Sequence, residues 1–157
     1  MSLSQQAIAE VSMAHEFFNR FTKNLIEAHS TFAPSDGMMS TAQQVAHAAH
    51  TIDWFFEGAF RPEGFDMNFE DRAKIIGQVT SLTAARAWFE KAVARAKSIL
   101  TTKSDTDLMA PLPPGPVMGG LPRMAIIGAL ADRTAHHRGA LTVCARLNNI
   151  VPPMPYM

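Results

Sequence analysis

The sequence predicts an all-α protein, a four-helix bundle with one long crossover connection. Four segments of about 18–25 residues place apolar side chains at intervals of three and four, the spacing of a helix with one buried face. Connections rich in proline and glycine separate these segments, and no convincing stretch alternates apolar and polar residues as a half-buried strand does. The sequence contains no internal repeat and no change of composition that would mark a second domain. We therefore expect a single domain over residues 1–157.

The first two helices have recognisable ends. The first runs from about Ser4 to Ala28, and the loop at residues 32–37 breaks it. The second begins at Ser40 with Gln43 three residues later, a capping-box spacing in which each side chain satisfies a free backbone amide of the other. We expect this second helix to end near Gly58.

A third helical region begins near residues 68–71, and its main part follows Ser81 to about Leu100. Residues 103–123 are too rich in proline and glycine for a long helix. We interpret them as a plain crossover connection, with a functional lid as the alternative. The fourth helix runs from about residues 122–124 to Leu147, where two asparagines and then two prolines stop it.

Bulk composition narrows the class of protein. Lys and Arg together number 14, as do Asp and Glu, so the formal net charge is zero. A basic excess that would favour nucleic acid is absent, and no apolar run is long enough for a membrane span. No signal peptide is visible at the start. The single cysteine, Cys144, is compatible with a reducing cytoplasm, and we interpret it as a buried apolar residue rather than a nucleophile.

The histidines of the fourth helix are not equivalent. At about 100° per residue, His137 faces the core with Leu130 and Leu141, whereas His136 turns toward the flank. Arg133 lies one helical turn before His137 on the same side. An inward histidine is either a hydrogen-bonded core residue or a metal ligand, and His137 alone does not decide between them.

The second helix offers further candidates at the edge of the core. His47 and His50 lie one turn apart beside Trp54, where a bundle can keep a pocket, and imidazoles on facing helices are a common way to build a metal site. Asp53 is an exposed helix-surface carboxylate, an acid–base group or a partner that orients a histidine; we favour the first.

Three fragments resemble a known family. AHHRGALTVCARL at residues 135–147 and VPPMPY at 151–156 resemble the C-terminal signature of the DinB-like (DinB/YfiT) superfamily of metalloenzymes. VAHAAHTIDWF at residues 45–55 resembles the motif of that family's second helix. The resemblance implies a four-helix bundle with a crossover connection, often a homodimer, that holds a divalent metal such as nickel or zinc on three histidines. It also implies thiol-dependent transferase or metal-dependent hydrolase activity, although many members have no known activity.

Carried over residue by residue, the resemblance assigns His47 and His137 as metal ligands and His136 as a non-ligand. The third ligand position is occupied by Arg133, which cannot bind a metal. Three outcomes stay open. His50 substitutes as third ligand, or the metal is lost and Arg133 pairs with an anion, or the site is structural. The predicted function is therefore a metal-dependent thiol transferase or hydrolase with an incomplete triad. The alternative is a non-enzymatic small-molecule-binding bundle, so enzymatic activity is open at this stage.

Overall fold

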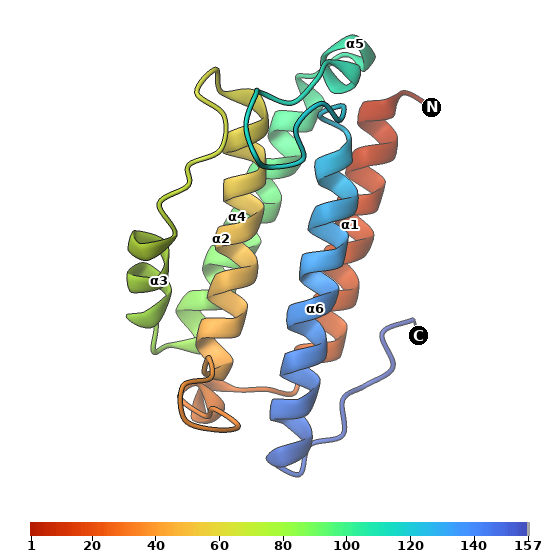
Figure 1. The fold of residues 1–157 in the computed structure, drawn as a ribbon. Helices are drawn as coiled ribbons and strands as arrows, with labels where there is room; N and C mark the ends of the chain where they lie inside the picture. The colour runs from red at the N-terminus through yellow and green to blue at the C-terminus, as the bar shows by residue number, and fades with distance from the viewer. Residues whose placement is uncertain (157) are drawn as a thin grey trace.

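Four long helices pack side by side in a computed structural model that describes residues 1–156 (Figure 1). They are α1 (Leu3–Thr22), α2 (Thr41–Phe60), α4 (Leu82–Thr101) and α6 (Ala125–Leu147). Helices α1 and α2 each contact both α4 and α6, which closes the bundle. Residues 1–156 form no β-strand, so the predicted all-α bundle is confirmed.

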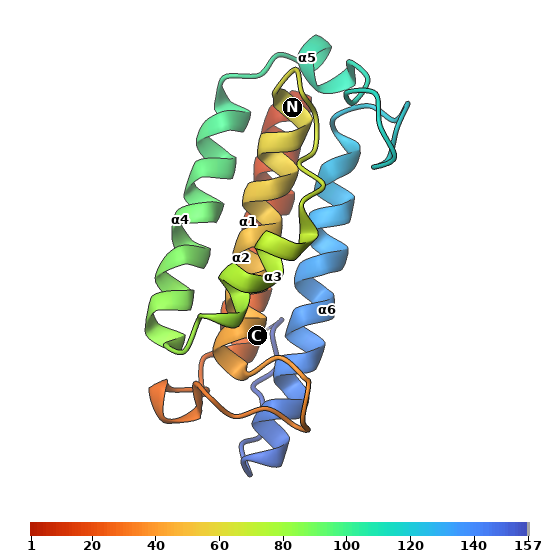
Figure 2. The same cartoon turned by 60° about the vertical axis from the view of Figure 1, so that its left-hand side comes forward.

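Three short elements lie outside the four-helix core: the 3₁₀ turn η1 (Glu27–His29) and the helices α3 (Phe69–Gly77) and α5 (Asp105–Met109). Helix α3 lies across the outer side of α2, apart from the other long helices (Figure 2). None of the helices in the described part of the chain combines the length and the apolar character that crossing a bilayer requires.

The capping box predicted at Ser40 forms at the start of α2. The Ser40 N–H donates to Gln43 Oε1 at 2.9 Å, and the Gln43 N–H donates to Ser40 Oγ at 3.3 Å. The end of α6 also follows the prediction, because Asn149 adopts a left-handed conformation with φ of 59°. These local signals place the histidine-bearing parts of both helices inside the bundle.

Helix α1 ends earlier than the sequence predicts, at Thr22 instead of Ala28. Arg86 on α4 donates from Nη2 to the carbonyl oxygens of Thr22 at 2.6 Å and Leu25 at 3.2 Å. These bonds satisfy carbonyls that a continuing helix would have used. Leu25 then turns into the core, whereas the neighbouring Ile26 is 58% exposed.

Gly58 is an interior residue of α2 and does not end the helix, which continues to Phe60. A Cβ atom at position 58 would lie 2.3 Å from Cδ1 of Phe65, far inside van der Waals contact. Glycine is therefore required here because the Phe65 ring packs directly against the helix backbone. The sequence prediction placed the end of the helix near this glycine, whose role is instead to allow the close packing of Phe65.

The crossover connection is folded rather than loose. Leu108 and Leu112 are buried, and the Leu112 N–H donates to the Leu121 carbonyl at 2.9 Å. An isolated bridge pairs Pro111 with Pro122. The connection thus closes on itself at the end of the bundle.

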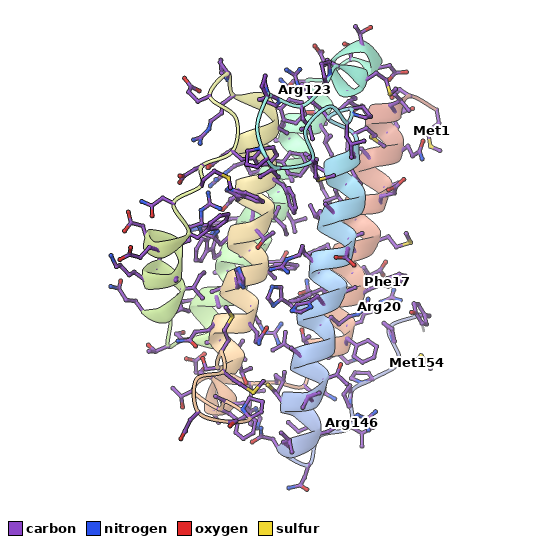
Figure 3. All side chains as sticks on the ribbon, viewed as in Figure 1. Met1, Phe17, Arg20, Arg123, Arg146 and Met154 are labelled. Carbon is purple, nitrogen blue, oxygen red and sulfur yellow. The ribbon has the colours of Figure 1, made fainter. Side chains whose placement is uncertain are left out.

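The C-terminal segment folds back along α1. Tyr156 packs edge-on against Phe17 with ring centroids 5.0 Å apart, and Arg20 Nη1 donates to the Pro155 carbonyl at 3.1 Å. Figure 3 shows Phe17 and Arg20 on the side of α1 that the chain end approaches. The segment therefore covers the α1 side of the bundle, away from the face that carries α3 (Figure 1).

The packing of Phe65 predicts that alanine substitutions at two glycines change the free energy of unfolding in opposite directions. Replacing Gly58 with Ala should lower the free energy of unfolding by about 1–3 kcal/mol, because the added methyl group overlaps the Phe65 ring. Replacing Gly128 with Ala should raise the free energy of unfolding by up to about 1 kcal/mol. A Cβ atom at this position meets no atom within 4 Å, and alanine has the higher helix propensity. Urea unfolding of both variants measures the difference. Equal stabilisation of the two would contradict the close approach of Phe65.

Candidate functional site

His47 on α2 and His137 on α6 meet across the bundle. Their ring centroids are 4.8 Å apart and the ring planes are inclined by 63°. His137 is 2% exposed, and His47 is half-buried at the edge of the core. The helical spacing orients the His137 ring inward, because residues 130, 134, 137 and 141 share the buried face of α6. His136 is exposed, as its position on the helix predicted.

Gln44 orients the deeper imidazole. The Nδ1–H of His137 donates to Gln44 Oε1 at 2.7 Å, which leaves the lone pair on Nε2. Gln44 is itself buried and lies one turn before His47 on α2. The same turn of α2 therefore contributes one imidazole of the pair and fixes the other.

Two nitrogen atoms of this pair have no hydrogen-bond partner among the described residues. They are His47 Nδ1 and His137 Nε2, and both atoms are buried. Burial, with the positive charge of Arg133 acting in the same direction, lowers the pKa of His47 to about 4 and that of His137 to about 3. Both imidazoles are therefore neutral at physiological pH.

His47, but not the deeper His137, lines a pocket of about 490 Å³ between α2, α3 and α6. His47, His50 and Arg133 line its polar side, and no carboxylate is among its lining residues. Burial lowers the pKa of His50, with the charge of Arg72 acting in the same direction. No residue of the crossover connection lines this pocket, which supports the interpretation of residues 103–123 as a connection and not a lid.

An aromatic wall on the α3 side completes the pocket. Trp54 packs against Phe55 and Phe69 with ring centroids 5.2 and 6.3 Å apart, and the Arg72 guanidinium lies 4.7 Å from the centre of the Trp54 ring. Arg72 is paired with Asp66, whose backbone carbonyl it also contacts through Nη2. Sequence reasoning missed Phe69 and Arg72, because nothing in the pattern indicated that the short helix lies over α2.

Side chains of α2 hold α3 at both ends. The Trp54 Nε1–H donates to the Asp66 carbonyl at 2.8 Å, just before α3. Gln43 Nε2 donates to the Gly77 carbonyl at 3.0 Å, at its last residue. The pocket wall is thus attached to the helix that carries His47.

Two other candidates from the sequence, Asp53 and Cys144, have contacts that indicate structural roles. Asp53 accepts from Trp88 Nε1 at 2.9 Å and from Arg95 Nη1 at 3.0 Å, and so ties α2 to α4. It is neither the freely exposed carboxylate we favoured nor a hydrogen-bond partner of a histidine. Cys144 is buried, and burial raises the pKa of its thiol, as expected for an apolar role.

The donor atoms do not fit a three-histidine metal centre. Among residues 1–156, no three His, Cys, Asp or Glu side chains are grouped so that they could hold a metal ion. His47 and His137 supply two imidazoles, and His50 does not complete a group of three with them. The guanidinium of Arg133 stands beside the pair and repels a cation.

The helix order, the crossover and the histidine positions can now be compared with known proteins. The sequence model of the DinB superfamily matches residues 12–141. The chain belongs to the DinB superfamily. The match to this superfamily spans α2, α3 and α4 and most of α1 and α6, and it includes both imidazoles of the central pair.

A solved structure of similar fold is the crystal structure of a conserved protein from Enterococcus faecalis. It aligns with a TM-score of 0.65 and 18% sequence identity, over 94% of this chain and 97% of that one. At this identity the likeness of the two chains concerns the fold alone. A comparison with functionally curated proteins finds no match.

The neutral histidine pair predicts a loss of stability between pH 7 and pH 5. An unfolded histidine has a pKa of about 6.5, well above the values of the two folded imidazoles, so the unfolded chain binds more protons as the pH falls. Each histidine adds a slope of up to about 1.4 kcal/mol per pH unit to the free energy of unfolding. Urea unfolding at a series of pH values measures this slope.

Matched variants test the assignment. His137→Asn removes one titrating group from the core and should reduce the slope, whereas His136→Gln, on the exposed side of the same helix, should leave it unchanged. A slope that is the same in both variants and in the parent protein would show that the buried pair is not responsible.

Proposed function

We propose that the protein is a small-molecule-binding member of the DinB superfamily whose pocket binds an organic anion through Arg133. One observation carries the proposal. Two guanidinium groups line the pocket, and Arg72 is paired with Asp66, whereas Arg133 forms no ion pair among residues 1–156. A charged, half-buried arginine in a pocket without carboxylates favours a ligand that brings the negative charge.

The neighbouring histidines suit this role because they stay neutral. A neutral imidazole carries one N–H donor and one acceptor, so His47 and His50 can hydrogen-bond a polar head group without adding charge. The guanidinium binds a carboxylate through two parallel N–H donors. The apolar body of the ligand then packs against Trp54 and the α3 wall. Binding of this kind requires no metal, and the proposed function includes no chemical reaction.

Arg133→Gln should weaken the binding of carboxylates at least ten-fold. A hydrogen bond to a charged group contributes about 1.5–3 kcal/mol, which corresponds to roughly 10- to 100-fold in affinity. Isothermal titration calorimetry of the full chain with 2-naphthoate and with octanoate measures the effect. Arg138→Gln is the matched control, since Arg138 lies on the same helix over Phe17 and Phe21 and away from the pocket. Equal affinities for the two variants would refute the proposed role of Arg133.

A second candidate is a divalent-metal-dependent thiol transferase or hydrolase with nickel or zinc. It draws on the two unpartnered nitrogens of His47 and His137, since such lone pairs are those that a metal uses. A third ligand is missing, so we assign no catalytic step to a metal. The homodimer and the cytoplasmic location that the sequence suggested stay predictions.

Position 133 separates the two candidates. Arg133→His removes the repelling charge and places a third imidazole one turn before His137. We expect this variant to bind zinc or nickel at least ten-fold more tightly than the parent chain, as measured by calorimetry and by elemental analysis of untagged protein after dialysis. Arg138→His adds an imidazole to the same helix outside the pocket and serves as control. If both variants bind metal alike, position 133 does not belong to the site.

A further inference from the structure

We propose that the ligand of this pocket is a flat aromatic monocarboxylate, held between Arg133 and the aromatic wall that α3 forms with α2. The inference rests on the proposed anion-binding function and adds the shape and the charge of the ligand. Two observations carry it: the planarity of the groups that line the pocket, and the pairing of its second cation.

Five of the thirteen residues that line the pocket carry planar rings. Trp54, Phe55 and Phe69 supply aromatic rings, and His47 and His50 supply imidazoles. The Trp54 ring is inclined by 52° to Phe55 and by 57° to Phe69, so the wall presents both ring faces and ring edges. Aromatic ligands pack favourably on such surfaces through offset and edge-to-face contacts.

The wall is fixed before any ligand binds. The indole N–H of Trp54 is bonded to the Asp66 carbonyl, and Arg72 lies over the rings of both Trp54 and Phe69, at 4.7 and 5.2 Å from their centres. A rigid ligand gains from a rigid wall, because neither partner loses much conformational freedom. A flexible alkyl chain would lose rotamer freedom here.

Phe69 is the residue of the wall whose exposure most directly indicates a contact with a ligand. It is 55% exposed at the first residue of α3, although its side chain is large and apolar. Its ring lies at the pocket surface and contacts Arg72 instead of the bundle core. A ligand ring that packs against Phe69 would cover this exposed apolar surface.

Charge fixes the ligand as a monoanion. Asp66 lies 3.5 Å from Arg72 Nη2 through its Oδ2 atom and so neutralises this cation at the pocket mouth. Of the two arginines that line the pocket, Arg133 is then the one without an ion-pair partner among residues 1–156. A second carboxylate on the ligand would be desolvated without a partner.

The size agrees with a compact ring system. A pocket of about 490 Å³ falls in the range that encloses a small organic molecule almost entirely. A ligand that spans from Arg133 to Phe69 contacts three helices at once: α6 through the arginine, α2 through Trp54, and α3 through the phenylalanine. One bound molecule would thus join the helix that carries the charge to the one that carries the wall.

Four probes that differ in shape and charge test this inference by calorimetry on the full chain. They are 2-naphthoate, 2-naphthamide, octanoate and naphthalene-2,6-dicarboxylate. We expect 2-naphthoate to bind at least five-fold more tightly than octanoate, ten-fold more tightly than the uncharged amide, and no less tightly than the dicarboxylate. Arg133→Gln should remove the difference between the acid and the amide.

Variants of the wall and of the compensating charge test the two observations separately. Phe69→Leu should reduce the preference for 2-naphthoate over octanoate at least two-fold, and Tyr156→Leu, a similarly exposed aromatic on the C-terminal segment, should not. Asp66→Asn frees the charge of Arg72 while its carbonyl bonds to Trp54 and Arg72 can remain. This variant should shift the preference toward the dicarboxylate at least five-fold.

The outcomes separate the two levels of the proposal. Equal binding of octanoate and 2-naphthoate, with Arg133→Gln weakening both, overturns the aromatic specificity but keeps the anion-binding function. Tighter binding of the dicarboxylate by the unmodified chain overturns the monoanion assignment alone. If no probe binds, or if Arg133→Gln changes none of the affinities, the anion-binding function fails and this inference fails with it.

Discussion

One fixed positive charge, that of Arg133, lies beside a buried and a half-buried imidazole, and the electrostatics of the pocket depend on it. Arg133 cannot lose its proton, and its charge adds to the burial that keeps His47 and His137 neutral. A protonated imidazole at either position would face a cation in a low-dielectric site. The pocket next to the pair therefore has a positive potential that comes from one residue and neutral hydrogen-bonding groups around it.

The attachment of α3 follows from the same helix that presents the imidazoles. Gln43 and Trp54 lie on α2 on either side of His47, and each donates to a backbone carbonyl at one end of α3. Ile76 is the one residue of α3 that is buried, so these two bonds and the Arg72 contact hold the helix where apolar burial alone would hold it weakly. The wall of the pocket is thereby coupled to the geometry of α2.

Local patterns predicted the bundle because they depend on neighbouring residues only. The capping box at Ser40 and the inward direction of His137 follow from helix geometry, and both are present. Gly58 and Asp53 were misread because their roles depend on contacts with Phe65 and with Trp88, which lie outside the helix that carries them. A sequence pattern contains no information about which distant side chain approaches a given backbone or carboxylate.

The candidate site shows the same division between local and tertiary information. The spacing of Arg133 and His137 is a property of one helix, and the resemblance to a known family placed His47 opposite them. The α3 wall and the pairing of Arg72 with Asp66 arise from two segments that touch only in the folded chain. This pairing changes the charge of the ligand that the pocket favours, which the number of arginines alone would not reveal. Two free guanidinium groups would favour a dianion, whereas one free and one neutralised group favour a single carboxylate. In the proposed function, the ligand class would thus depend on a carboxylate that does not line the pocket, through its effect on a cation that does.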